Sequence, residues 1–237
     1  MTSPPHRSPP RTASMRLVTA LLAALVLTLI SSCSTSPQQQ QTGLPDGTRL
    51  LADSAAAMRT VKSVHFTIAA QGDTPGISLR YADGQLTQEG SAKGTAKVDQ
   101  GGKLVDQEFV IIGNTLYLRG PAGDYQKLPS SVAGAVYDPS VILSPDRGIA
   151  AVLASAKDAK TEAREPIAGV DSYRVSATFP KDSLGKLLPG ISKDTTGQVW
   201  LAVQGLRLVE AQFRVGNGLV SAHFTDYDTP VAINSPV

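Results

Sequence analysis

The most reactive side chain in this sequence is a single thiol, and its position limits what it can do. Cys33 is the only cysteine among 237 residues, so no disulfide can form within the chain. It follows an uncharged apolar run at 17–30, LVTALLAALVLTLI, and precedes the polar segment STSPQQQQ. A buried core thiol fits this position badly, which favours covalent modification of Cys33.

The apolar run has the features of a secretory signal peptide. Residues 1–16 contain three arginines and no acidic residue, and a basic start before a short apolar stretch is typical of such signals. The run of 14 residues is shorter than the roughly 20 needed to cross a bilayer as a helix. Met1 or Met15 can serve as the start, because the shorter form is already a complete signal.

The residues before the cysteine indicate which modification to expect. Ile30-Ser31-Ser32-Cys33 resembles the bacterial lipobox, in which the thiol receives a diacylglycerol and cleavage makes the cysteine the first residue. We therefore expect a lipoprotein signal peptide at 1–32 and a lipidated N-terminus with a flexible tether at 33–48. Two or more acyl chains anchor a protein durably, so we expect the protein on the outer face of the plasma membrane, in the cell envelope or periplasmic space.

The charge balance excludes nucleic acid as a partner. Three of the 22 basic residues lie within 1–32, so 19 basic residues face 20 acidic ones in the remainder. No basic excess is left to drive binding through counterion release.

Residue types that perform catalysis occur without a catalytic pattern. His65 and His223 each alternate with apolar neighbours, as strand histidines do, and no zinc-ligand spacing is present. The nucleophile elbow, the P-loop and the dinucleotide-binding glycine pattern are also missing. We expect no enzyme, no metal, and no cofactor besides the acyl groups on Cys33 and a bound lipid as ligand.

Periodicity predicts the elements that position the side chains. An i, i+3, i+4 stripe predicts a helix over 48–61, capped by Asp46 or Thr48. Period-two runs then predict antiparallel strands from SVHFTIAA at 63–70 to GLVSAHFTDYD at 218–228, with Ile77, Leu79 and Tyr81 on one face. Helical inserts are predicted at 137–159, with Asp138 and Asp146 as caps, and at 180–190. Residues 49–237 form one α+β domain, with helices on a single face of an antiparallel sheet.

With these pieces in order, the sequence resembles the mycobacterial and actinobacterial LppX/LprA/LprF/LprG lipoproteins, LprG and LprF most closely. The matching segments cover residues 48–231. They are the lipobox at Cys33, VKSVHFTI, PGISL, GTAKVDQGG, FVIIGNTLY, YDPSVILSPDRGIAAVLA, AKTEAREPIAG and VWLAVQGLRLVEAQ.

The resemblance implies a strongly bent antiparallel half-barrel of the LolA/LolB type, with helices on its concave face around an apolar cavity. It implies binding and carriage of acylated lipids or glycolipids, such as phosphatidylinositol mannosides or triacylglycerol, between membranes and without catalysis. It also implies a monomer anchored to the membrane, with an envelope exporter as a further partner.

Acyl chains require a dry apolar lining and no hydrogen-bonding partner. Candidate lining residues on the strands are Phe66, Ile68, Ile77, Leu79, Ala96, Val98, Phe109, Ile111, Leu116, Leu118, Trp200 and Leu201. Candidates on the helical inserts are Val141, Ile142, Leu143, Ile149, Val152, Leu153, Leu184, Leu187 and Leu188.

The same residues are also compatible with an ordinary solid core. A membrane-anchored sensor or scaffold that regulates an envelope partner therefore remains an alternative to a lipid carrier. A continuous apolar void between sheet and helices separates the two.

Overall fold

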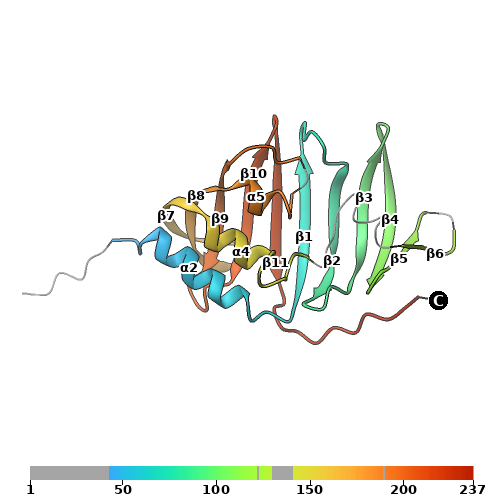
Figure 1. Ribbon diagram of the computed structural model, residues 1–237, viewed down its shortest axis with the longest axis horizontal. Helices are drawn as coiled ribbons and strands as arrows, with labels where there is room; N and C mark the ends of the chain where they lie inside the picture. The colour runs from blue at the N-terminus through green and yellow to red at the C-terminus, as the bar shows by residue number, and fades with distance from the viewer. Residues whose placement is uncertain (1–42, 122, 130–140, 189, 237) are drawn as a thin grey trace, which may run out of the picture. The chain divides into compact units, whose positions relative to one another are not determined.

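The structure, a computed structural model, describes residues 43–121, 123–129, 141–188 and 190–236. Figure 1 shows its helices and strands in chain order. They are α2 (Gly47–Met58), β1 (Ser63–Gln71), β2 (Leu79–Thr87), β3 (Ala92–Gln100), β4 (Lys103–Ile112), β5 (Thr115–Arg119), β6 (Gln126–Pro129), α4 (Ile149–Ser155), β7 (Lys157–Ile167), β8 (Val170–Phe179), α5 (Lys181–Leu184), β9 (Thr195–Ala202), β10 (Leu208–Val215) and β11 (Gly218–Thr225).

All described strands belong to one antiparallel sheet of 11 strands, in the order β6-β5-β4-β3-β2-β1-β11-β10-β9-β8-β7. Every neighbouring pair except one is consecutive along the chain. The exception is β1 with β11, where Phe66 pairs with Phe224 and Ile68 with Ala222. This pairing joins an N-terminal meander to a C-terminal one, so residues far apart in sequence lie side by side at the centre of the sheet. The sheet is open, because β6 and β7 do not pair.

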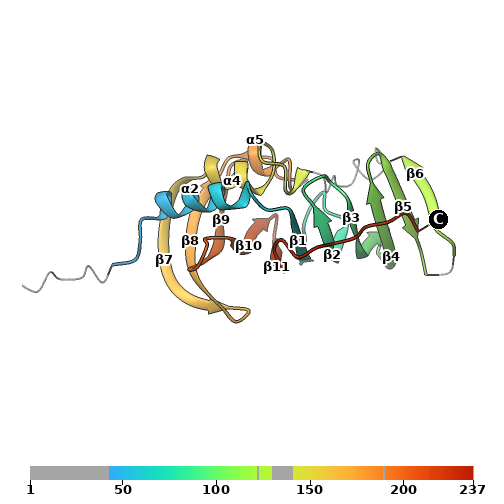
Figure 2. The same ribbon diagram turned by 90° about the horizontal axis from the view of Figure 1, so that it is seen from below.

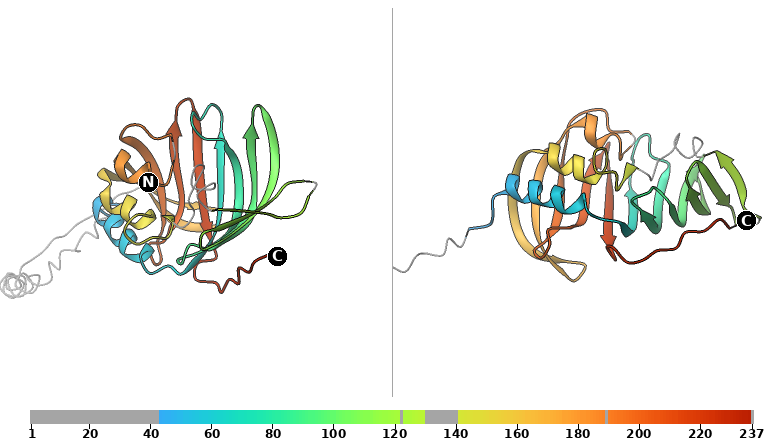
Figure 3. Two further views of the ribbon diagram at one scale, coloured as in Figure 1. Left: turned by 45° about the vertical axis from the view of Figure 1, so that its right-hand side comes forward. Right: turned by 60° about the horizontal axis from the view of Figure 1, so that its bottom comes forward.

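The helices lie on one face of the sheet, over its β7–β11 part (Figure 2). The sheet curves around them, as two further views show (Figure 3). Buried residues of α2 and α4, such as Leu51 and Leu153, share one apolar core with Val175 of β8 and Phe224 of β11. The predicted α+β class, with helices on the concave face of a bent antiparallel sheet, is confirmed.

The local boundaries differ from the predictions in three places. Gly148 occupies the N-cap of α4, so Asp146 does not cap it; the predicted cap Asp138 lies outside the described residues. The insert at 180–190 is helical only in the four residues of α5, which has Gly185 as its C-cap. Strand β6 was not predicted, since its four residues are too few to show a period.

A register shift between Leu79 and Tyr81 corrects the predicted face of β2. Leu79 is partly buried against the core, whereas Tyr81 is one of the exposed large hydrophobic residues. The extra residue of a bulge reverses the alternation of side chains, which the sequence pattern did not show.

Two facing glycines bring β2 and β3 unusually close. Gly84 pairs with Gly94, and a Cβ placed on Gly94 would lie 2.1 Å from the carbonyl oxygen of Asp83. Only glycine fits this approach without displacing a backbone. Within the described ranges, no helix is both long and apolar enough to cross a membrane.

Candidate ligand cavity

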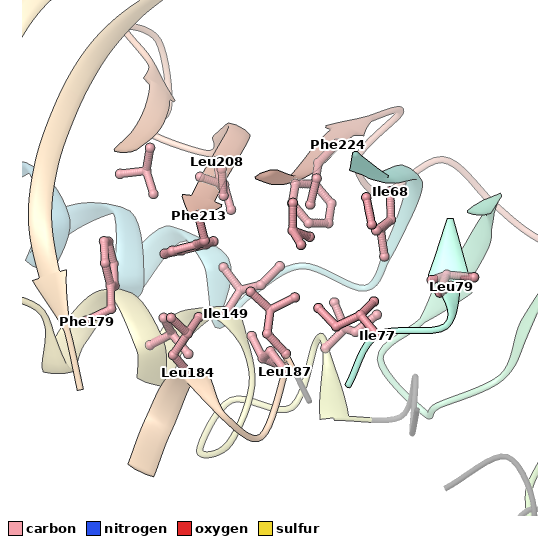
Figure 4. A pocket seen from close by; sticks show the side chains of 18 of the residues that line it. Ile68, Ile77, Leu79, Ile149, Phe179, Leu184, Leu187, Leu208, Phe213 and Phe224 are labelled. Atoms are coloured by element: carbon pink, nitrogen blue, oxygen red, sulfur yellow. The ribbon is translucent and has the colours of Figure 1, made fainter. Parts of the chain in front are cut away.

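An apolar cavity of about 180 Å³ lies between the helices and the concave face of the sheet. Side chains from β1, β8, β9, β10 and β11 form its floor, and α4, α5 and the residues after α5 form its roof (Figure 4). Its lining residues are Ile68, Ala70, Gly76, Ile77, Ser78, Leu79, Ile142, Ile149, Val152, Leu153, Phe179, Leu184, Leu187, Leu188, Val199, Leu208, Ala211, Phe213, Val220, Ala222 and Phe224.

The lining offers almost no polar chemistry. Ser78 is its only residue with a polar side chain, and no lining residue is charged. A polar ligand would give up its hydrogen bonds to water on entering the cavity, and this lining offers almost no partners to replace them. The cavity therefore suits a hydrocarbon group.

One end of the cavity reaches the surface. Gly76 and Ser78 line it and are both exposed, and Ile77 between them is partly exposed. The opposite wall, with Phe179, Val199 and Leu153, is buried. The segment 76–78 therefore marks the mouth.

The volume limits what this conformation can hold. Pockets for drug-sized ligands typically measure about 300–1,000 Å³, and a 150 Å³ apolar cavity accommodates benzene. The cavity of about 180 Å³ therefore has room for a short piece of one acyl chain. A lipid with two or more chains requires it to widen.

The structure brings ten of the predicted lining residues together around this cavity: Ile68, Ile77, Leu79, Ile142, Ile149, Val152, Leu153, Leu184, Leu187 and Leu188. All ten come from β1, from the segment that leads into β2, or from the two helical inserts. Here the period-two and helical patterns were sufficient.

Eleven predicted residues do not border this cavity, and as lipid contacts they stay predictions. Ala96, Val98, Phe109 and Leu118 are partly buried on β3, β4 and β5, beyond the part of the sheet that the described helices cover. Phe66, Ile111, Leu116, Val141, Leu143 and Leu201 are buried and fill space instead of bounding it.

Trp200 lies farthest from the predicted role. Its neighbours Val199 and Leu201 belong to the apolar core, whereas Trp200 is buried outside that core cluster. Its indole Nε1 donates a hydrogen bond to Oε1 of Glu165 at 2.9 Å. Alternation along β9 places Trp200 on the opposite face from Val199, and Val199 lines the cavity.

Sequence reasoning missed a group of lining residues on the C-terminal strands: Phe179, Val199, Leu208, Ala211, Phe213, Val220, Ala222 and Phe224, together with Ala70 on β1. Their alternation was visible in the sequence. What it did not show is that β11 pairs with β1, which turns this half of the sheet into the floor of the cavity.

Several of the described charged residues form ion pairs with one another, and none of these lines the cavity. Asp171 forms an ion pair with Arg164, and the Arg164 hydrogen bonds hold the pKa of Asp171 below its ordinary value. Glu108 accepts hydrogen bonds from Arg119 and Tyr125, which likewise lower its pKa.

His65 and His223 take part in strand-to-strand contacts. His65 lies 3.2 Å from Oγ1 of Thr225 and 3.3 Å from Oδ1 of Asp83, and Nδ1 of His223 lies 3.7 Å from Oε2 of Glu210. Within the described ranges, no three metal-ligating side chains gather closely enough to hold an ion.

An open antiparallel half-barrel that encloses an apolar cavity beneath its helices defines the class of protein to which this chain belongs. Comparison of sequences gives the family: the chain is a member of the LppX_LprAFG lipoproteins, which it matches over residues 46–233. The predicted family is confirmed.

Named relatives agree with this assignment. The chain is 34% identical over 236 residues to the lipoarabinomannan carrier protein LprG of Mycolicibacterium smegmatis, which covers 96% of this chain and 98% of that protein. It is 29% identical to the protein of the same name from Mycobacterium tuberculosis, over 88% of this chain and 89% of that protein.

Solved structures show the same fold. LprF from Mycobacterium bovis superposes with a TM-score of 0.74 and 25% identity, over 82% of this chain and 99% of that one. LppX from Mycobacterium tuberculosis superposes with a TM-score of 0.61 and 21% identity, over 78% and 98%, and supports the fold alone.

Proposed function

We propose that this protein is a cell-envelope lipoprotein that binds acyl chains of lipids or glycolipids in the cavity and carries them between membranes without catalysis. The observation that supports this most directly is the apolar cavity of about 180 Å³, with one polar side chain in its lining and an exposed mouth. A carrier needs such a surface and no reactive group.

The relatives favour a glycolipid as cargo. The LprG proteins are named lipoarabinomannan carriers, and a ligand of that kind has acyl chains joined to a large polar part. In the proposed complex the chains occupy the cavity while the polar part stays in water at the mouth. Phosphatidylinositol mannosides and triacylglycerol are further candidates of the same acyl chemistry.

The energetics suit reversible transfer. Each methylene taken from water into an apolar site is worth about 0.8 kcal/mol, which holds a chain firmly against loss to water. A donor bilayer offers nearly the same environment, so exchange between membrane and cavity is close to balanced.

Attachment and location complete the proposal. Cys33, outside the described residues, is the proposed site of the diacylglycerol. The anchor would place the folded domain at the outer face of the plasma membrane. In this proposal the protein is a monomer, and its partners are the membrane and an envelope exporter.

Lipid extraction followed by mass spectrometry tests the proposal. We expect the domain at 43–237, incubated with mycobacterial envelope membranes and repurified, to release acylated lipid in near-stoichiometric amount. A heat-unfolded sample treated in parallel is the control for adsorption. Domain that returns without lipid would instead support the anchored sensor or scaffold.

A further inference from the structure

The mouth of the cavity is formed by a loop whose position depends on a few named contacts. We call residues 72–78, between β1 and β2, the mouth loop; Gly76, Ile77 and Ser78 of this loop line the cavity. These three residues lie between the end of β1 and the start of β2, so they belong to neither a helix nor a strand.

Close backbone contacts seat the mouth loop between two other segments. A Cβ on Gly190, after α5, would lie 2.5 Å from the carbonyl oxygen of Pro75, and a Cβ on Gly218 would lie 2.5 Å from Cγ2 of Thr74. Glycine at both positions allows the loop to sit directly against the segment that follows α5 and against the β10–β11 hairpin. In this position the loop narrows the mouth.

One side chain links the mouth loop to the sheet. Nη1 of Arg80 donates to Oγ1 of Thr74 at 2.8 Å and to the carbonyl oxygen of Gly72 at 3.3 Å. Nη2 lies 3.5 Å from Oδ2 of Asp99 on β3. We call these contacts the Arg80 latch.

The Thr74 hydroxyl is the critical acceptor of the latch. Thr74 is only 3% exposed, so water does not readily replace Arg80 as its partner. The loop begins at Gly72, which has a φ of +72°, and ends at Ser78, whose carbonyl oxygen accepts from Asp99 N–H at 2.8 Å. A turn bond from Ile77 N–H to Thr74 oxygen, 3.1 Å, keeps residues 74–77 together as a unit.

We propose that Arg80 is a positioning residue that holds the mouth loop closed over the lipid cavity, and that release of the Arg80 latch admits acyl chains. The inference rests on the proposed function. Its physical basis is the mismatch between a cavity of about 180 Å³ and the larger volume that a multi-chain lipid requires. The sheet ladders resist widening. The side-chain hydrogen bonds that link the loop to the sheet come from one partly exposed guanidinium, that of Arg80, and the backbone bond from Asp99 N–H to Ser78 holds only the end of the loop.

Kinetics of a neutral acyl probe test the latch. The probe is the methyl ester of 11-(dansylamino)undecanoic acid, whose dansyl group brightens in apolar surroundings and which offers Arg80 no charge. In stopped-flow mixing with the domain, we expect Arg80→Met to raise the association and dissociation rates by about five- to tenfold, as for loss of a partly exposed charge-assisted hydrogen bond. The dissociation constant should change by less than about threefold, because the bound state keeps the same apolar lining.

Two companion variants separate positioning from structure. Thr74→Val keeps the methyl group that faces Gly218 but removes the acceptor, and should reproduce the faster exchange even where Arg80→Met destabilises the fold. Arg80→Lys retains a donor and should return the rates toward those of the unaltered protein. Urea unfolding reports the stability of each variant.

The matched control is Lys97→Met. It removes a basic side chain from the adjacent strand, where Nζ of Lys97 lies 3.2 Å from Oδ1 of Asp106, in an ion pair that is not part of the Arg80 latch. Its rates should equal those of the unaltered protein.

The outcomes distinguish the two proposals. An unaltered protein that takes up no probe contradicts the proposed function and the latch together. Uptake with unchanged rates in Arg80→Met and Thr74→Val overturns the latch alone. Slower association, or a weaker affinity with unchanged association, also overturns it, because Arg80 would then contribute to the bound state.

Discussion

At the scale of single residues, several titratable side chains in the described part of the chain form pairs between strands. Glu108 with Arg119, Asp171 with Arg164, and His65 with Asp83 each join neighbouring strands. Ion pairs between exposed side chains contribute little to stability, about 0–1 kcal/mol each. None of these paired side chains lines the cavity.

Asp228 forms a different kind of contact: it attaches the segment after β11 to the start of β1. It accepts a hydrogen bond from Lys62 N–H at 2.8 Å and pairs with Arg207. The Lys62 N–H, followed by Arg207, lowers the pKa of Asp228 below its ordinary 3.8. A lowered folded-state pKa stabilises the protein above the unfolded-state pKa, and this contribution disappears as the pH falls through the folded-state value.

We therefore expect Asp228→Asn to reduce the free energy of unfolding at pH 7 by about 0.5–1 kcal/mol, a figure discounted because the side chain is 35% exposed. Asparagine still accepts from Lys62 and tolerates the φ of +59°, so the substitution removes mainly the charge. Urea unfolding at pH 7, 4.5, 3 and 2 should show the difference shrinking as the pH falls below the ordinary pKa of 3.8. An equal difference at all four pH values would refute the electrostatic origin.

At the scale of elements, caps and close approaches decide where the helices and strands sit. Oδ1 of Asp46 accepts from Arg49 N–H at 2.8 Å and caps α2, whose buried side packs on the core over β7. Gly84 and Gly94 allow β2 and β3 to approach closely near the middle of the sheet. Both features are local, and each is testable by one substitution.

Loss of the cap should weaken α2 by a predictable amount. We expect Asp46→Ala to lower the free energy of unfolding by about 1 kcal/mol, because an N-terminal N–H loses its acceptor, and Asp46→Asn to retain most of it. Asp53→Ala is the control, since Asp53 lies on the same helix and makes only an exposed 3.7 Å ion pair with Arg49. Urea unfolding measures all three; equal losses in Asp46→Ala and Asp53→Ala would rule out a capping effect.

The glycine approach predicts a larger effect. Gly94→Ala should cost about 2–3 kcal/mol in the free energy of unfolding, because its Cβ would lie 2.1 Å from the Asp83 carbonyl oxygen and the strands must separate. Gly120→Ala, where a Cβ would meet nothing within 4 Å, should be nearly neutral. Similar stabilities of the two variants, measured by thermal or urea unfolding, would contradict the close approach.

At the scale of the whole domain, the cavity exists because segments from both halves of the chain surround it. Ile68 of β1, Leu153 of α4 and Phe224 of β11 all line it. Interiors of proteins are normally filled to the density of organic crystals, so a void of about 180 Å³ has a cost in packing. A ligand that fills the void restores the missing packing contacts.

Filling the void with a side chain should compete with the ligand. Val152 lines the cavity from α4 and is 4% exposed, and we expect Val152→Trp to reduce lipid loading at least about fivefold, because the indole occupies the space of several methylenes. Lipid recovered after incubation with membranes, quantified by mass spectrometry, measures the loading.

Circular dichroism verifies that the sheet of Val152→Trp is intact, and Val170→Trp on the exposed β7–β8 turn is the matched control. Unchanged loading in a folded Val152→Trp protein would remove α4 from the lipid-contacting wall.

How far the sequence predicts this fold can be judged from particular residues. The i, i+3, i+4 stripe over 48–61 predicted α2, because that signal is local. The bulge at Leu79 and Tyr81 was missed, since nothing in an alternating pattern shows where a residue will be inserted. Gly148 replaced Asp146 as the cap of α4 for a similar reason: several adjacent positions were compatible with the pattern.

The sequence by itself determined the family, the α+β class, the alternation along each strand and ten of the lining residues. The tertiary structure alone decided that β11 pairs with β1, that Val199 and not Trp200 faces the cavity, and that Phe109 and Leu118 lie beyond it. The physical reason is that periodicity defines two faces of a strand but not which one the helices cover. That choice depends on contacts between residues more than 100 positions apart, such as Ile68 with Ala222.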